Sequence, residues 1–158
     1  MEHPHEHHQH SMKSPYKQLA VMALVHLAIM YVAMFAMINR GAYFYNNTNM
    51  LYMAVLMAAP VTLFMLFSMR HMYPNQKLNI ALAVVFALLT LGSYGAIRAQ
   101  VGVGGKQFLR AMIPHHSGAI LMCREADIKD AEIAALCKNI IDSQQKEIDQ
   151  MEAILKRL

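Results

Sequence analysis

The sequence is short of negative charge over most of its length. No Asp or Glu occurs between Glu6 and Glu125, and charged residues make up 15% of the 158 residues, against about 25% in soluble domains. A soluble domain needs carboxylates on its solvated faces, whereas a carboxylate in hydrocarbon is costly. The long stretch without acidic residues therefore indicates a lipid-embedded region.

Motifs of catalysis and of nucleic-acid binding are also missing. The sequence has no HExxH, nucleotide-binding loop or nucleophile motif, and no His follows His116 to make the Glu-x-x-His pairs of a di-iron bundle. Lys and Arg lie mostly at the ends of apolar runs and form no basic stripe. We therefore predict that the chain is not an enzyme and binds no nucleic acid.

Three apolar windows are each long enough to cross a bilayer. They cover residues 19–38, 50–69 and 78–97, about 20 residues apiece, which spans ~30 Å of hydrocarbon. We predict a three-helix transmembrane region at 18–98, with the lipid bilayer as its partner. Basic residues are nearly balanced between the two sides, but their pairs at the first helix and second loop favour a cytoplasmic N-terminus.

A His-rich tail precedes the windows, and we expect it to be flexible over residues 1–17. Its histidines are irregularly spaced, unlike a purification tag, and such a tract can bind Cu(II), Ni(II) or Zn(II). They are His3, His5, His7, His8 and His10.

The composition changes after a Gly-rich linker at 99–106. Carboxylates return, and two apolar stripes at helical spacing predict an antiparallel helical hairpin over 107–158, with Asp130 as the N-cap of its second helix. The hairpin has too little core to stand alone, so we expect a homo-oligomer in which two copies form a four-helix bundle. The overall fold class is all-α. The stripes are Phe108, Met112, His115, Ala119, Met122 and Ala126, then Ile133, Cys137, Ile140, Gln144, Ile148, Met151, Leu155 and Leu158.

The segment AMIPHHSGAILMC concentrates soft donor atoms, because it holds Met112, His115, His116 and Met122. Imidazole and thioether suit copper, and thioether especially suits Cu(I). With a turn near residue 128, His115 would lie level with Ser143, and Met112 level with Glu147. The plainer interpretation is that the two histidines only hydrogen-bond Gln144 and Glu147.

MIPHHSGAILM, followed by Gln144-x-x-Glu147-Ile148-x-x-Met151, resembles the domain of unknown function 305 family. The resemblance covers about residues 106–158, and more loosely the whole chain. It implies a ferritin-like helical hairpin on the export or periplasmic side of a bacterial inner (cytoplasmic) membrane. It also implies copper binding through Met and His, which gives metal roles to Met112, His115, His116, Met122 and, more weakly, Met151. Together with Glu147 on the facing helix, these are the predicted ligands of the hairpin.

The first window carries a second set of soft donors. Met22, His26, Met30, Met34 and Met37 recur every three or four residues, within a ~120° arc of one helix. An ionisable residue inside the membrane is a functional hypothesis by default, so His26, Met30 and Met34 could form part of a Cu(I) path. The alternative is that methionine, being flexible, fills helix interfaces.

Two cysteines, Cys123 and Cys137, stand outside any recognised spacing. They could form a disulfide in an oxidising compartment, add thiolate to a Cu(I) site, or pack as small apolar side chains. The sequence thus predicts a membrane-anchored protein that handles copper, most readily Cu(I), by sequestration, storage or delivery to a metal-delivery partner. The alternatives are an oligomeric structural or adaptor protein without a metal, and a Cu(I)-conducting transporter.

Overall fold

The computed structural model describes residues 15–158, and the metal-binding prediction for the histidines of the N-terminal tail lies outside them. Five α-helices make up the described part: α1 (Pro15–Ala33), α2 (Thr48–Ser68), α3 (Gln76–Ala99), α4 (Gly105–Glu125) and α5 (Ala131–Arg157). Two short 3₁₀ helices, η1 (Gly41–Tyr43) and η2 (Arg70–Met72), lie in the links. The predicted all-α class is confirmed, and no strand occurs within residues 15–158.

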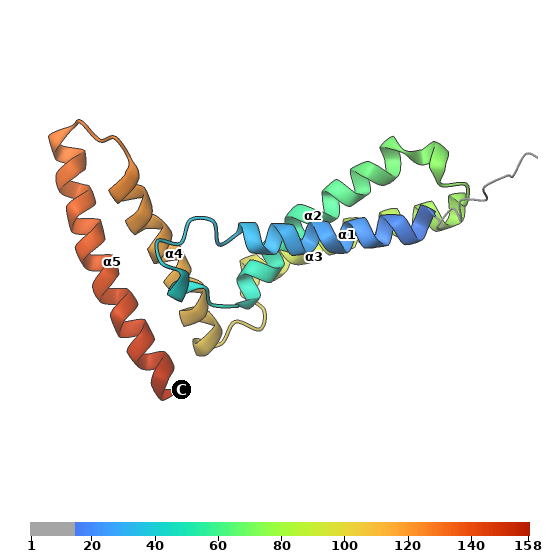
Figure 1. Ribbon diagram of the computed structural model, residues 1–158. Coiled ribbons are helices and arrows are strands. Elements are labelled where there is room, and N and C mark those ends of the chain that lie inside the picture. Colours follow the sequence, from blue (N-terminus) through green and yellow to red (C-terminus); the bar gives the residue numbers. More distant parts are fainter. Residues whose placement is uncertain (1–14) are drawn as a thin grey trace, which may run out of the picture.

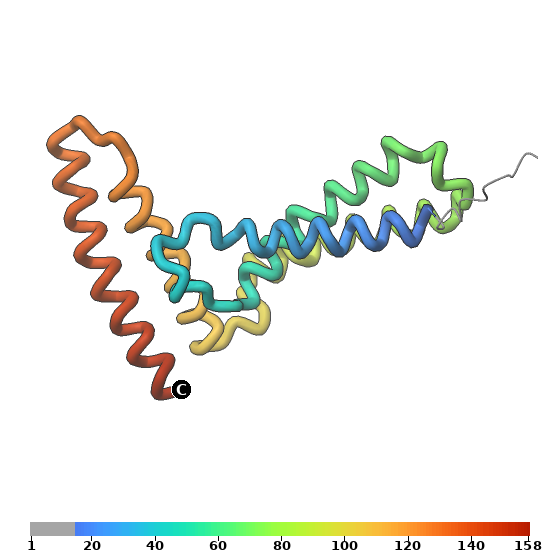
Figure 2. The backbone as a smooth tube through the Cα atoms, in the orientation of Figure 1, coloured from blue at the N-terminus to red at the C-terminus, as the bar shows by residue number. Residues whose placement is uncertain are grey.

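Helices α1, α2 and α3 are long and apolar enough to cross a membrane. They form one elongated bundle (Figures 1 and 2). The α2 helix packs against both α1 and α3, and its buried face consists mainly of small residues, including Ala54, Ala58 and Thr62. Small side chains let neighbouring backbones approach closely in lipid. The Thr62 hydroxyl donates to the carbonyl of Ala58 at 3.0 Å, so its polar group is satisfied within the helix.

Helix α1 is shorter than the first window predicts, because it ends at Ala33 rather than at residue 38. Phe35 and Ala36 donate to carbonyls three residues back, the tighter bonding that often closes a helix. Phe35 then packs against Phe44, with ring centroids 4.1 Å apart, and is only 5% exposed. This aromatic contact folds residues 34–47, which we call the junction loop, back over the end of the bundle.

Helices α4 and α5 form the predicted antiparallel hairpin, which lies across the end of the bundle (Figure 1). Asp130 caps α5 as predicted, since its carboxylate accepts from the backbone N–H groups of Glu132 and Ile133. A disulfide joins Cys123 to Cys137 at the turn end of the hairpin. The hairpin core contains Leu109, Ile113, Ile120, Ile148 and Met151, with Tyr43 of the junction loop.

The junction loop packs against one side of the hairpin through polar contacts. Ser117 of α4 exchanges two hydrogen bonds with Asn39, both of 2.7 Å. The Tyr45 hydroxyl donates to Glu152 at 3.1 Å, and Gln145 donates to Tyr43 at 3.2 Å. The hairpin therefore gains core and hydrogen bonds from the link between α1 and α2, which the sequence did not predict.

The apolar stripe predicted for α4 is not its buried face. Phe108 and Met122 are 49% and 53% exposed, and His115 and Ala126 are also exposed. The buried positions lie further round the helix, because α4 faces both α5 and the junction loop. We call the row of Phe108, Met112, His115, Ala119, Met122 and Ala126 the α4 outer stripe; its members Met112 and Ala119 are partly buried, and Met112 packs against the edge of the core. The predicted α5 stripe is buried only at its centre, at Ile148 and Met151.

Candidate metal centre

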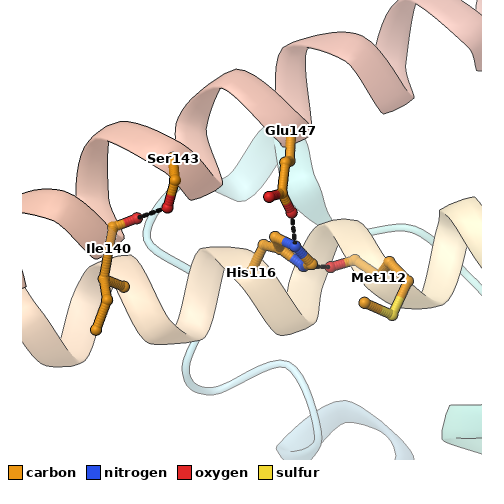
Figure 3. Close-up of polar contacts among 5 residues, drawn as sticks. All are labelled: Met112, His116, Ile140, Ser143 and Glu147. Carbon is orange, nitrogen blue, oxygen red and sulfur yellow. Dashed lines mark hydrogen bonds and ion pairs between the residues drawn. The ribbon is translucent and has the colours of Figure 1, made fainter.

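His116 and Glu147 form the central contact between the two hairpin helices (Figure 3). The Nε2 atom of His116 lies 2.6 Å from a carboxylate oxygen of Glu147. The histidine side chain is 10% exposed, whereas that of Glu147 is 57% exposed. The imidazole is therefore held inside the hairpin, while its carboxyl partner is open to solvent and accessible to an arriving ion.

Both ring nitrogens of His116 face oxygen atoms. Nδ1 lies 3.0 Å from the backbone carbonyl of Met112, which can only accept, so Nδ1 must carry a hydrogen. The Nε2 contact then needs one more proton, placed either on Nε2 or on the Glu147 carboxyl. A metal ion that bound Nε2 would replace this shared proton, because an imidazole ligand must be free of hydrogen at the ligating atom.

The contact is displaced by about one helical turn from the predicted register. We expected Met112 to lie level with Glu147, but His116, four residues later, contacts that carboxylate. The Met112 sulfur is turned away from the contact in Figure 3. Gln144, the other predicted histidine partner, instead has a buried side-chain oxygen without a hydrogen-bond partner among residues 15–158. A buried acceptor without a partner is uncommon and lies close to this contact in sequence.

The remaining predicted ligands of the hairpin do not converge on His116 within one chain. His115 is exposed on the α4 outer stripe, and its ring centroid lies 6.1 Å from that of His116. Met122 belongs to the same stripe and is 53% exposed. Met151, by contrast, is 9% exposed within the apolar core. Among residues 15–158, no three His, Cys, Asp or Glu side chains are gathered closely enough to hold an ion.

The soft donors of the first window lie in α1 and in the turns that follow it. His26, Met30 and Met34 are half-buried, whereas Met22 and Met37 are 45% and 48% exposed. These three residues thus lie partly within the bundle. Both alternatives, a copper path and ordinary helix packing, require such a position.

The two cysteines are paired with each other, which answers one question the sequence left open. Their Cα atoms lie 5.2 Å apart across the hairpin, within the usual range for a disulfide. In this oxidised form neither sulfur is a thiolate, so neither is a metal ligand. The cysteines therefore fasten the hairpin rather than belong to the candidate centre.

The residues that position the site from outside the hairpin were missed by sequence reasoning. Asn39, Tyr43 and Tyr45 lie in the junction loop, far from the MIPHH segment in sequence. Ser117 directly follows the two histidines. A serine on an apolar helix needs a hydrogen-bond partner, so this residue was the only local indication that another segment packs against α4.

The fold and site thus define a class: a helical hairpin with a His–carboxylate contact, anchored by three apolar helices. The family model for the domain of unknown function 305 matches residues 96–155. Uncharacterized protein L153 of Acanthamoeba polyphaga mimivirus is 34% identical over 111 residues, which cover 69% of this chain and 71% of that protein. The chain belongs to the domain of unknown function 305 family. No solved structure matches it.

Proposed function

We propose that this protein is a membrane-anchored metal-handling protein that binds copper at the His116–Glu147 contact. The observation that carries the proposal is a buried imidazole whose Nε2 lies 2.6 Å from an oxygen of a solvent-accessible carboxylate. Imidazole is a good copper ligand, and thioether donors favour Cu(I) over harder ions. Met112 lies one turn from His116, and rotation of its flexible side chain would bring a sulfur donor toward the ion.

One chain supplies too few donors, and we propose that a second copy completes the site. Ser117 of α4 and Gln145 of α5 contact the junction loop. Phe108 and Leu136 each lie nine residues earlier on the same helices, and nine residues place a side chain on the opposite side of a helix. The α4 outer stripe and the adjacent side of α5 thus form one outward face of the hairpin. A partner hairpin on this face would make a four-helix bundle and bring His115 and Met122 of each copy to the interface.

We further propose that the hairpin lies outside the cytoplasm, on the periplasmic side of a bacterial inner membrane. The disulfide supports this orientation, because disulfides persist in oxidising compartments and are rare in the cytosol. The distribution of basic residues leans the same way. Such a location suits storage or sequestration of copper, or its delivery to a partner protein.

A Cu(I) competition titration against a chromogenic chelator tests the metal site. The full chain would be used with the five tail histidines replaced by alanine, so that the tail does not mask the hairpin. We expect His116→Ala to weaken Cu(I) binding at least about tenfold, and His115→Ala/His116→Ala to abolish it. His71→Ala, at an exposed position in η2, is the matched control and should bind as the parent does.

The second candidate function is an adaptor whose hairpin only mediates assembly. The observation in its favour is that both nitrogens of His116 already have partners within the chain. If the parent and the His115→Ala/His116→Ala variant bound Cu(I) equally weakly, only the adaptor function would remain. Copper conduction along α1 also remains a prediction, and copper flux into proteoliposomes that survives Met30→Leu/Met34→Leu would remove it.

A further inference from the structure

An apolar groove runs along the membrane-spanning bundle at the end opposite the hairpin. It lies between the second half of α2 and the first half of α3, and its volume is about 740 Å³. Its walls include Leu63 and Phe67 from α2, and Ile80, Val84 and Ala87 from α3. No carboxylate occurs anywhere in this part of the sequence.

The mouth of the groove is polar and positively charged. Arg70, Gln76 and Asn79 line it, and they lie in η2 and the first turn of α3. Arg70 is exposed and takes part in neither of the two ion pairs found within residues 15–158. A lone guanidinium at the rim of an apolar groove calls for an anionic partner, and phosphate suits its forked donors well.

The dimensions of the groove fit one leaflet of a bilayer. From Gln76 to Ala87 the α3 helix rises about 16 Å, while half of the hydrocarbon core is about 15 Å thick. The polar mouth would then lie at headgroup level and the Ala87 end near the bilayer midplane. An apolar groove at this depth is filled by something apolar, since water there would find few hydrogen-bond partners.

We propose that this groove is a binding site for one anionic phospholipid, with an acyl chain along α2 and α3 and the phosphate on Arg70. The apolar walls accept the chain irrespective of the headgroup. The guanidinium adds a preference for negative headgroups, and the exposed side-chain amide of Gln76 donates a hydrogen bond to the same phosphate. The site is separate from the His116–Glu147 contact and does not depend on metal binding.

Native mass spectrometry of the full chain in mild detergent tests the site. The protein would be titrated with phosphatidylglycerol and with phosphatidylcholine of the same acyl chains. We expect one tightly bound phosphatidylglycerol, and a loss of about fivefold in its affinity in Arg70→Gln, with little change for phosphatidylcholine. Ala87→Phe, which fills the groove, should weaken both lipids.

Two matched variants serve as controls. Arg98→Gln removes an exposed arginine from the other end of α3, and Ala28→Phe adds the same ring to an exposed position of α1. Neither should change lipid binding. Equal phosphatidylglycerol affinity in Arg70→Gln, an exposed and structurally harmless change, would overturn the headgroup assignment. A change of subunit number in Ala87→Phe, with lipid binding intact, would show that a second copy fills the groove instead.

Discussion

Individual side chains in the hairpin and the junction loop divide into those with internal partners and those that face outward. His116, Ser117 and Tyr45 each have hydrogen-bond partners from another part of the chain. His115 and Met122 are exposed on the α4 outer stripe. The two adjacent histidines therefore differ in role, since one joins α4 to α5 and the other is available to a partner.

Tyr45 allows a test of the contact between the junction loop and the hairpin. Burial and the hydrogen bond that it donates to Glu152 raise the pKa of Tyr45 above its ordinary value. A raised folded-state pKa means that the neutral hydroxyl stabilises the fold, fully below about pH 10 and progressively less as pH rises through the folded value. We expect the free energy of unfolding of the hairpin, measured by chemical denaturation, to fall in a step above about pH 10.

Tyr45→Phe should lose this hydrogen bond at every pH, at a cost of about 1 kcal/mol, and should lack the alkaline step. Glu152→Gln is the control, because its amide oxygen still accepts from the hydroxyl while the carboxylate charge is gone. Its alkaline step should move to lower pH. An unchanged alkaline step in Tyr45→Phe would assign the transition to another tyrosine.

Among the elements, helices α4 and α5 are held together at three positions along the hairpin. The disulfide closes the turn end, the His116–Glu147 contact joins the middle, and the apolar core around Ile113 and Met151 extends toward the other end. Asp130 fixes the start of α5 by capping its first turn. The helices are therefore held in one register, which keeps the candidate ligands at fixed heights.

Reduction of the disulfide should destabilise the hairpin without dissolving it. The bond closes a short loop, since the cysteines are 14 residues apart in sequence, and closing such a loop stabilises the fold by about 3 kcal/mol because it removes chain entropy from the unfolded state. We expect reductant to lower the free energy of unfolding of α5, as followed by hydrogen exchange, by roughly this amount. Cys123→Ser/Cys137→Ser should match the reduced protein and should not respond to reductant; an equal response would implicate an effect of the reductant elsewhere.

The whole molecule consists of an apolar bundle and a polar hairpin connected by two segments. The link from α3 to α4 continues the chain, and the junction loop contacts the hairpin through Asn39 and Asn47 and α1 through Asn46 (Figure 1). With three spans, the junction loop and the hairpin share one side of the membrane, and the groove mouth at Arg70 lies on the other. If the three apolar helices span a membrane, any metal bound to the hairpin would be held at the opposite membrane face from the proposed lipid site.

Assembly of the whole molecule is testable through the outward face of the hairpin. Leu136 and Met122 are 57% and 53% exposed on this face, and a buried lysine in a dimer core would lack a partner. We expect Leu136→Lys and Met122→Lys each to weaken self-association more than tenfold, as measured by size-exclusion chromatography with light scattering. Ala135→Lys lies on the side of α5 that points away from α4 and from the proposed interface, so this variant should assemble normally. An unaffected oligomer in both stripe variants would place the interface elsewhere.

The sequence was sufficient to predict three apolar helices, the hairpin and the cap at Asp130. These features depend on local rules, namely run length, periodicity and capping chemistry, which residues near one another in the chain determine. Helix α1 ends at Ala33, five residues before the first apolar window does, and the Phe35–Phe44 contact that closes the loop involves residues on either side of a turn.

Only the tertiary structure decided which face of α4 is buried and which histidine meets Glu147. Both outcomes depend on the junction loop, which covers a side of α4 that periodicity alone left free, and on a register one turn from the predicted one. The pairing of Cys123 with Cys137 was likewise open until the two helices were placed side by side. Such contacts depend on how distant segments pack together in three dimensions, and a local sequence pattern carries no information on that packing.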